Sequence, residues 1–266
     1  MTPMSAFFRN IPPFPLRIRG MIRALLLPLL LAGTLCCPAE TVAKKTPDNP
    51  AKKVGWIETV TMDIEGWTVH VDKQLLDGTH QEEGTKAVAM LRNHLQRIAI
   101  LVPGEPLANL RKVEIWIEHQ HPELGSMQYH PGARWLRDRG YQPELLKKVH
   151  IPRAAALLSR GQLLKHPAVI LHELAHGYHD QILGFDDPGI MKVYQKAMAA
   201  GIYDKVLLYN GRQVRHYATT NHKEYFAEAT EAYFYRNDFY PFVHAELKQH
   251  DPAGFAEMER VWGKAN

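Results

Sequence analysis

The segment that most constrains the fold is residues 167–180, with the sequence PAVILHELAHGYHD. Its first half is apolar, and proline is favoured in the first turn of a helix, so we expect a buried helix that begins near Pro167. On such a helix His172 and His176 are four residues apart and face the same side, where both imidazoles can reach one tetrahedral cation. Glu173 would lie beside that cation, where it can take a proton from a water molecule.

A different reading of this helix is that its two histidines are only hydrogen-bonded in a protein core. The longer pattern HExxHxxGxxH is absent, because His179 occupies the glycine position and Ile182 the position of the third histidine. This excludes the metzincin arrangement. We expect His179 to be a polar surface residue or a neighbour of a ligand rather than a ligand.

A third ligand is expected in residues 221–234, with the sequence NHKEYFAEATEAYF. Glu224, Glu228 and Glu231 recur at spacings of four and three and therefore share one face of a helix. If that face is buried, the carboxylates need a cation or hydrogen-bond donors. Spacing favours Glu224 over Glu228 as the ligand, although Asn221 with Glu224 also resembles a capping box, which would direct Glu224 to backbone amides. For Glu231 we expect a solvated or structural carboxylate.

The two segments together resemble the metallopeptidase family of the catalytic domain of anthrax lethal factor and the Pro-Pro endopeptidases. The resemblance covers residues 169–234 and is carried by HELAH and by the later YATTNHKEYFAE, which matches the family's Y…TN…E(F/Y)FAE block. It implies that His172, His176 and Glu224 bind zinc, that Glu173 is the general base, and that Tyr217 stabilises the oxyanion. It also implies that Glu228 orients a ligand histidine.

The motif and the resemblance predict an α+β, zincin-like domain of the gluzincin type. It would have a small mixed sheet, an active-site helix and a helical C-terminal part. It would bind one Zn²⁺ per chain and hydrolyse a peptide or protein substrate with metal-activated water. Two alternatives remain open: a zinc-containing protein that binds peptides without cleaving them, and a metal-dependent amidase acting on a non-peptide component of the cell wall.

Residues 127–130 are a candidate for an edge strand above the metal that would pair with an extended substrate. Tyr129, His130 and Trp135 would then shape side-chain pockets. An ordinary packed loop is the equal alternative for this segment. We interpret His119, His121 and His150 as polar loop residues.

The remaining pattern places strands before helices, as in α+β domains. Residues 56–72 alternate as in a hairpin with its turn at Glu65-Gly66. Apolar residues from Val88 to Val102, at spacings of three and four, predict a helix that ends at Pro103-Gly104. Residues 113–118 predict a strand. Further helices are expected over about residues 153–164, from Pro167, and from Lys223 to Val261 with breaks near Asn237 and Asp251.

The N-terminal part predicts export. Residues 1–39 read as a signal or leader segment, with Arg23 before a short apolar run and small residues after it. Residues 40–54 read as a flexible linker, and residues 55–266 as a single domain. A membrane role is expected only through an uncleaved leader, because the apolar run is shorter than the roughly 20 residues that span a bilayer.

The leader also explains the charge and cysteine content. Its four arginines account for the formal net charge of +4, so the remaining chain is neutral apart from its histidines. This argues against a broad basic surface for nucleic acid. Both cysteines, Cys36 and Cys37, lie in the leader, so an exported chain without it can form no disulfide. The oligomeric state is not indicated by the sequence.

Overall fold

The computed structural model describes residues 52–264. The predicted leader and residues 40–51 of the predicted linker lie outside this range. Val54, near the end of the predicted linker, is buried, and its N–H donates to the carbonyl of Gly140 at 2.9 Å. The folded part therefore begins before residue 55. Within residues 52–264, no helix has both the length and the apolar character that crossing a bilayer requires.

The predicted hairpin is confirmed by strands β1 (Thr59–Ile64) and β2 (Trp67–Asp72). Its two-residue turn has positive φ at both positions, 55° at Glu65 and 87° at Gly66, which matches the twist of the two strands. The alternation of β2 directs one set of side chains into the core, namely Trp67, Val69 and Val71.

The sheet continues with β3 (Ile115–Ile117), β5 (Val149–Ile151) and β4 (Gln128–Tyr129) in the order β1-β2-β3-β5-β4. The pairs β2–β3 and β3–β5 are parallel, whereas β1–β2 and β5–β4 are antiparallel. The segment 127–130 therefore supplies an edge strand, which is one of the two equal alternatives for this segment. With strands followed by helices, the domain belongs to the α+β class.

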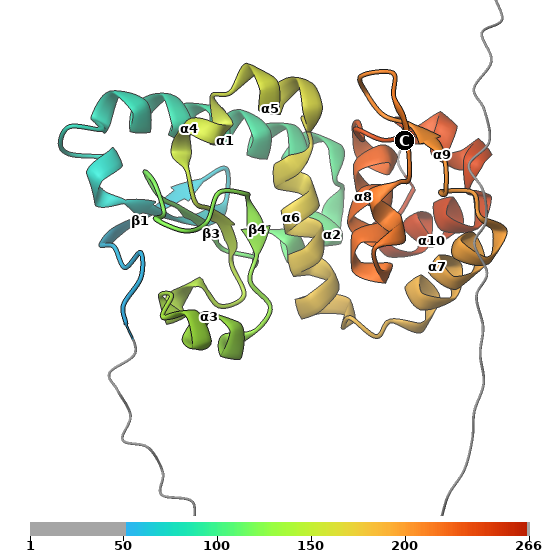
Figure 1. Cartoon of the computed structure of the whole chain (residues 1–266), viewed down its shortest axis with the longest axis horizontal. Helices are drawn as coiled ribbons and strands as arrows, with labels where there is room; N and C mark the ends of the chain where they lie inside the picture. Colours follow the sequence, from blue (N-terminus) through green and yellow to red (C-terminus); the bar gives the residue numbers. More distant parts are fainter. Residues whose placement is uncertain (1–51, 265–266) are drawn as a thin grey trace, which may run out of the picture. The chain divides into compact units, whose positions relative to one another are not determined.

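The long helix predicted from the apolar stripe is α1 (Gln81–Leu101), and the helix expected from Pro167 is α6 (Val169–Tyr178). Figure 1 shows α6 between the sheet and α8 (His222–Phe234). The C-terminal breaks fall as predicted, before α9 (His244–His250) and α10 (Pro252–Trp262). Other elements of the domain are α2 (Gly104–Leu110), α3 (Ala133–Arg139), α7 (Pro188–Ala200), β6 (Val206–Leu207) and β7 (Gln213–Val214).

One predicted helix is wrong in its extent. Residues 153–164 form two short helices, α4 (Ala154–Leu157) and α5 (Arg160–Lys165). The Ser159 hydroxyl accepts a hydrogen bond from the N–H of Gln162 and so starts a second helix. Because α5 ends before Pro167, the chain turns there and enters α6 from a new direction.

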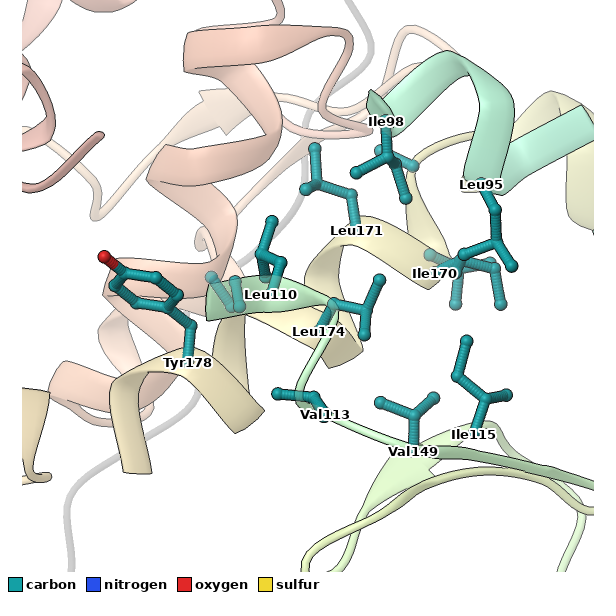
Figure 2. Packing of buried hydrophobic residues seen from close by; sticks show 14 of the residues in the cluster. Leu95, Ile98, Leu110, Val113, Ile115, Val149, Ile170, Leu171, Leu174 and Tyr178 are labelled. Carbon is teal, nitrogen blue, oxygen red and sulfur yellow. The ribbon is translucent and has the colours of Figure 1, made fainter. Parts of the chain in front are cut away.

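The core lies between α6, α1 and the sheet. Figure 2 shows Leu95 of α1 near Ile170 of α6, with Ile115 and Val149 of the sheet on the other side; all four are fully buried. At the far end of α6 the packing is closer still. A Cβ atom on Gly177 would lie 2.5 Å from Cγ1 of Val113, which precedes β3, so α6 approaches this segment more closely than a larger residue allows.

Candidate metal site

Three side chains from α6 and α8 bring one polar atom each to a common point. Nε2 of His172 lies 3.1 Å from Nε2 of His176. Oε2 of Glu224 lies 3.3 Å from each of these nitrogens. The helical spacing of four places the two imidazoles on one face of α6, and the packing of α8 against α6 brings the carboxylate opposite them.

This triangle has the dimensions of a zinc ligand set. Ligand atoms about 2.0–2.1 Å from a tetrahedral ion are separated by about 3.3 Å. Oε2 of Glu224 is shielded from solvent and has no hydrogen-bond partner among the described residues. Burial raises the pKa of Glu224, but the adjacent His172 and His176 outweigh burial and hold it well below its usual range. The donor set therefore fits a divalent cation.

The capping alternative for Glu224 is resolved by the geometry of the start of α8. Oδ1 of Asn221 accepts hydrogen bonds from the N–H groups of Lys223 and Glu224, at 2.9 and 3.1 Å. The Glu224 side chain does not complete the capping box, because its carboxylate faces the two histidines of α6 instead. Asn221 caps the helix alone and leaves Glu224 free.

A buried carboxylate fixes the orientation of His172. Oε1 of Glu231, which is fully buried, lies 2.6 Å from Nδ1 of His172, whereas the nearest oxygen of Glu228 is 3.8 Å away. The hydrogen bond that the resemblance implies for Glu228 is therefore made by Glu231. With its proton on Nδ1, His172 presents the lone pair of Nε2 to the common point.

The same oxygen of Glu231 also accepts a hydrogen bond from Nε2 of His166, at 2.9 Å. These three residues could in principle form a second cation site. The 2.6 Å separation between Glu231 and His172 is too short for two ligands of one tetrahedral ion but typical of a charge-assisted hydrogen bond. We therefore describe His166, Glu231 and His172 as a hydrogen-bonded chain.

Glu228 and Glu231 are close neighbours in a buried region and differ in charge. Burial, followed by the repulsion of Glu231, raises the pKa of Glu228 to about 8. Burial also raises the pKa of Glu231, but His166 and His172 outweigh it and lower that pKa to about 2. Near neutral pH the negative charge is therefore carried by Glu231.

Glu173 is oriented by the edge strand. Its Oε2 accepts a hydrogen bond of 2.9 Å from the backbone N–H of Tyr129 in β4. Burial raises the pKa of Glu173 above its ordinary value, although the neighbouring His172 and His176 oppose the shift. This carboxylate is thus held in one position and has an increased affinity for protons.

The edge strand is itself fixed to the end of α6. The Tyr129 hydroxyl donates to Oδ2 of Asp180 at 2.7 Å, and the ammonium of Lys147 pairs with the same oxygen. Gln181 donates to the Tyr129 hydroxyl and to the carbonyl of Lys147. Asp180 and Gln181 belong to a π-helical turn (His179–Leu183), a feature often found beside functional sites.

A cavity of about 530 Å³ opens above the triangle. Tyr217 lines it and is 48% exposed, so its ring projects into open space beside the site. Burial, followed by the charge of Glu224, raises the pKa of the Tyr217 phenol, which therefore keeps its proton. The cavity wall also includes β4 residues, in particular Gln128 and Tyr129.

Several histidines differ from their expected positions. His150 is not a loop residue: it is fully buried on β5, where its Nε2 lies 3.0 Å from Oε1 of Glu118. His121 does lie in a loop, but it is buried there, with 3% of its surface exposed. His119 lies in a loop, as expected, where it is partly buried and pairs with Glu83. His150 alternates with Val149 and Ile151, which face the main core, and is buried on the opposite face of the sheet beside His121 and His130. The loop-rich sequence around it does not indicate this strand.

Two of the three expected pocket residues point elsewhere. His130 is buried and lies 3.0 Å from His150, and Trp135 packs with a separate apolar cluster that includes Tyr141. Of the three, Tyr129 alone lines the cavity.

His179 is not a surface residue: it is fully buried against Phe226, because the π-helical turn rotates it inward.

Glu231, His166 and the backbone amide of Tyr129 are parts of the site that sequence reasoning missed. The spacing of Glu231 placed it on the correct helix face, but it did not show which carboxylate reaches His172.

In comparisons with known proteins, no family model, curated protein or solved structure matches this chain.

Proposed function

We propose that the chain is an exported zinc metallopeptidase with a zincin-type fold. The observation that carries this proposal is the triangle formed by Nε2 of His172, Nε2 of His176 and Oε2 of Glu224, with sides of 3.1 to 3.3 Å. A zinc ion held by these residues would supply a Lewis acid for a peptide carbonyl and would lower the pKa of a water molecule to about 7.

Glu173 is the general base in this proposal. One of its oxygens is occupied by the amide of Tyr129, so the other is available to take a proton from the attacking water. The same carboxylate then delivers the proton to the leaving nitrogen. Its raised pKa suits both steps, since a group with a pKa nearer neutrality exchanges protons more readily.

Tyr217 is the oxyanion donor in this proposal. Its protonated phenol lines the cavity beside Glu224. A donor directed at the carbonyl oxygen would stabilise the negative charge that develops there. Among the described residues, His172, Glu173, His176, Tyr217 and Glu224 all line this one cavity.

A peptide is favoured over a cell-wall amide by the open edge of β4. The N–H of His130 donates to the carbonyl of Lys148, the residue that precedes β5. By strand alternation, Met127 and Tyr129 therefore direct their backbone groups away from β5. Such an edge can add an extended peptide as a further strand. β4 also lines the cavity above the triangle, which brings a peptide in this position to Glu173.

Metal content and peptide cleavage test the proposal together. Elemental analysis of the purified chain should give one zinc, which Glu224→Ala loses and Glu228→Ala retains. Glu173→Gln should keep its zinc and lose all cleavage of a mixed peptide library. Retained cleavage by Glu173→Gln would overturn the mechanism, and loss of zinc in the Glu228 variant alone would overturn the ligand assignment. A zinc-loaded wild type that binds peptides without cleaving them would instead identify a binding protein.

A further inference from the structure

The cavity above the triangle is one lobe of a longer cleft. A second cavity of about 500 Å³ shares Ser126, Met127, Lys165, His166 and Glu173 with the first. The two cavities therefore meet at Glu173 and run along the same segment of chain that leads into β4. A peptide lying on this edge would pass through both lobes.

Two cations line the second lobe. Lys165, the last residue of α5, is exposed and borders both lobes, and Arg153 lines the second lobe alone. Neither has a carboxylate within 4.0 Å among the described residues, although other lysines and arginines of the domain do. The polar side chains of Ser159 and Gln162 complete the lining on this side.

The guanidinium of Arg153 is held in place. Its Nη2 and Nε donate to the carbonyl of Gly125 at 2.9 and 3.3 Å. These two bonds use part of the five N–H donors of the group and leave others available to a ligand. A fixed cation with free donors loses little conformational entropy when it binds a carboxylate.

Among the described residues that line the second lobe, Glu173 is the only carboxylate. Glu173 and Glu224 would balance the two positive charges of a divalent ion. Glu228 and Asp238 line the first lobe and not the second, although Asp238 is close enough to Lys165 to interact with its charge. With the ion bound, the lobe that holds Arg153 and Lys165 keeps a net positive charge.

We propose that Arg153 and Lys165 bind an acidic side chain of the peptide substrate, so that the enzyme prefers sequences with aspartate or glutamate near the cleaved bond. The inference rests on the proposed peptidase function and adds the class of substrate. It follows from the charge of the second lobe and from the position of Lys165 beside both lobes.

The test uses sets of ten-residue peptides that differ at one position, which holds Asp, Ala or Lys. Wild type should cleave the best Asp peptide about tenfold faster, as kcat/KM, than its Ala counterpart. Lys165→Glu should reverse the order so that the Lys peptide is preferred, and Arg153→Gln should weaken the preference for Asp. Lys192→Glu on α7, outside the cleft, makes the same charge change and should leave the preference as in wild type.

A binding measurement separates this inference from the proposed function. Fluorescence anisotropy of the same labelled peptides with Glu173→Gln reports affinity without turnover, and the Asp peptide should bind about tenfold more tightly than the Ala peptide, less so at high salt. Two results would overturn the inference and leave the proposed peptidase function standing. One is cleavage of the Asp, Ala and Lys peptides at equal rates, and the other is the same order of preference among these peptides in Lys165→Glu as in wild type. Tighter binding of the Asp peptide by a protein that cleaves none of the peptides supports the inference on charge and contradicts the proposed function.

Discussion

Nδ1 of His172 and Oε1 of Glu231 lie 2.6 Å apart, although the residues are 59 positions apart in the chain. This contact joins α6 to α8 and sets the tautomer that leaves Nε2 of His172 as a lone-pair donor. Partners of this kind typically contribute 10–100-fold to metal affinity.

Glu231→Gln should therefore weaken zinc binding about 10–100-fold, because a neutral amide polarises His172 less than a carboxylate does. Competition with a chromogenic chelator at neutral pH measures the change. Glu228→Gln is the matched control. With a pKa of about 8, Glu228 is already mostly neutral near pH 7, so the zinc affinity of this variant should stay close to that of wild type. Equal losses in the two variants would contradict the assignment.

Tyr217→Phe should retain zinc and peptide affinity but lower kcat about 10²–10³-fold, the usual loss for one oxyanion donor. The substitution keeps the ring and removes only the hydroxyl of a residue that lines the cavity. Initial rates over a range of peptide concentrations give kcat and KM separately. A rise in KM with unchanged kcat would show that the hydroxyl binds the ground state instead.

Gly177→Ala should destabilise the domain by about 1–3 kcal/mol, because the new methyl group would collide with Val113. Urea unfolding followed by circular dichroism measures the change. Gly161→Ala in α5 is the control, since the nearest atom to its new Cβ is Ser159 Oγ at 3.6 Å. That variant should match or slightly exceed wild type, as a helical glycine replaced by alanine usually does.

Acid should destabilise the domain in part through His94. Burial, followed by the charge of Arg97, lowers the pKa of His94 from 6.5 to about 4. Between these values the unfolded chain binds a proton that the folded chain does not, so stability falls as the pH falls from about 6.5 toward about 4. At about pH 5 the loss from this residue is about 2 kcal/mol.

His94→Leu should therefore lose about 2 kcal/mol less than wild type when the pH is lowered from about 7 to about 5. Urea unfolding at the two pH values gives the comparison. The test depends on the change with pH in each protein and not on their relative stability at neutral pH. Identical changes would mean that His94 remains accessible to protons in the folded state.

The elements with strong periodicity could be predicted from the sequence, and those held by tertiary contacts could not. The apolar stripe of α1 and the alternation of β2 gave the correct elements because burial determines which face each side chain takes. The break between α4 and α5 depends on one serine hydroxyl, which a helical pattern does not reveal. The pattern around His150 predicts a loop, because a three-residue strand is too short to show alternation.

The same distinction holds within the site. His172 and His176 follow from helical spacing alone, since both lie on α6. The choice among the carboxylates of α8 requires the angle at which α8 crosses α6, and a sequence does not contain that angle. Spacing could therefore place Glu224, Glu228 and Glu231 on one face without showing that Glu224 reaches the triangle and Glu231 reaches the back of His172.

The hydrogen bond from Tyr129 to Glu173 has a consequence for the register of a bound peptide. An added strand normally pairs its carbonyls with the amides of the edge that receives it. At Tyr129 that amide is already bound to Glu173. In the proposed complex, the peptide carbonyl opposite Tyr129 would therefore find no backbone donor and would be available to the hydroxyl of Tyr217. In the proposed complex, this one missing contact would set which peptide bond lies next to Glu173.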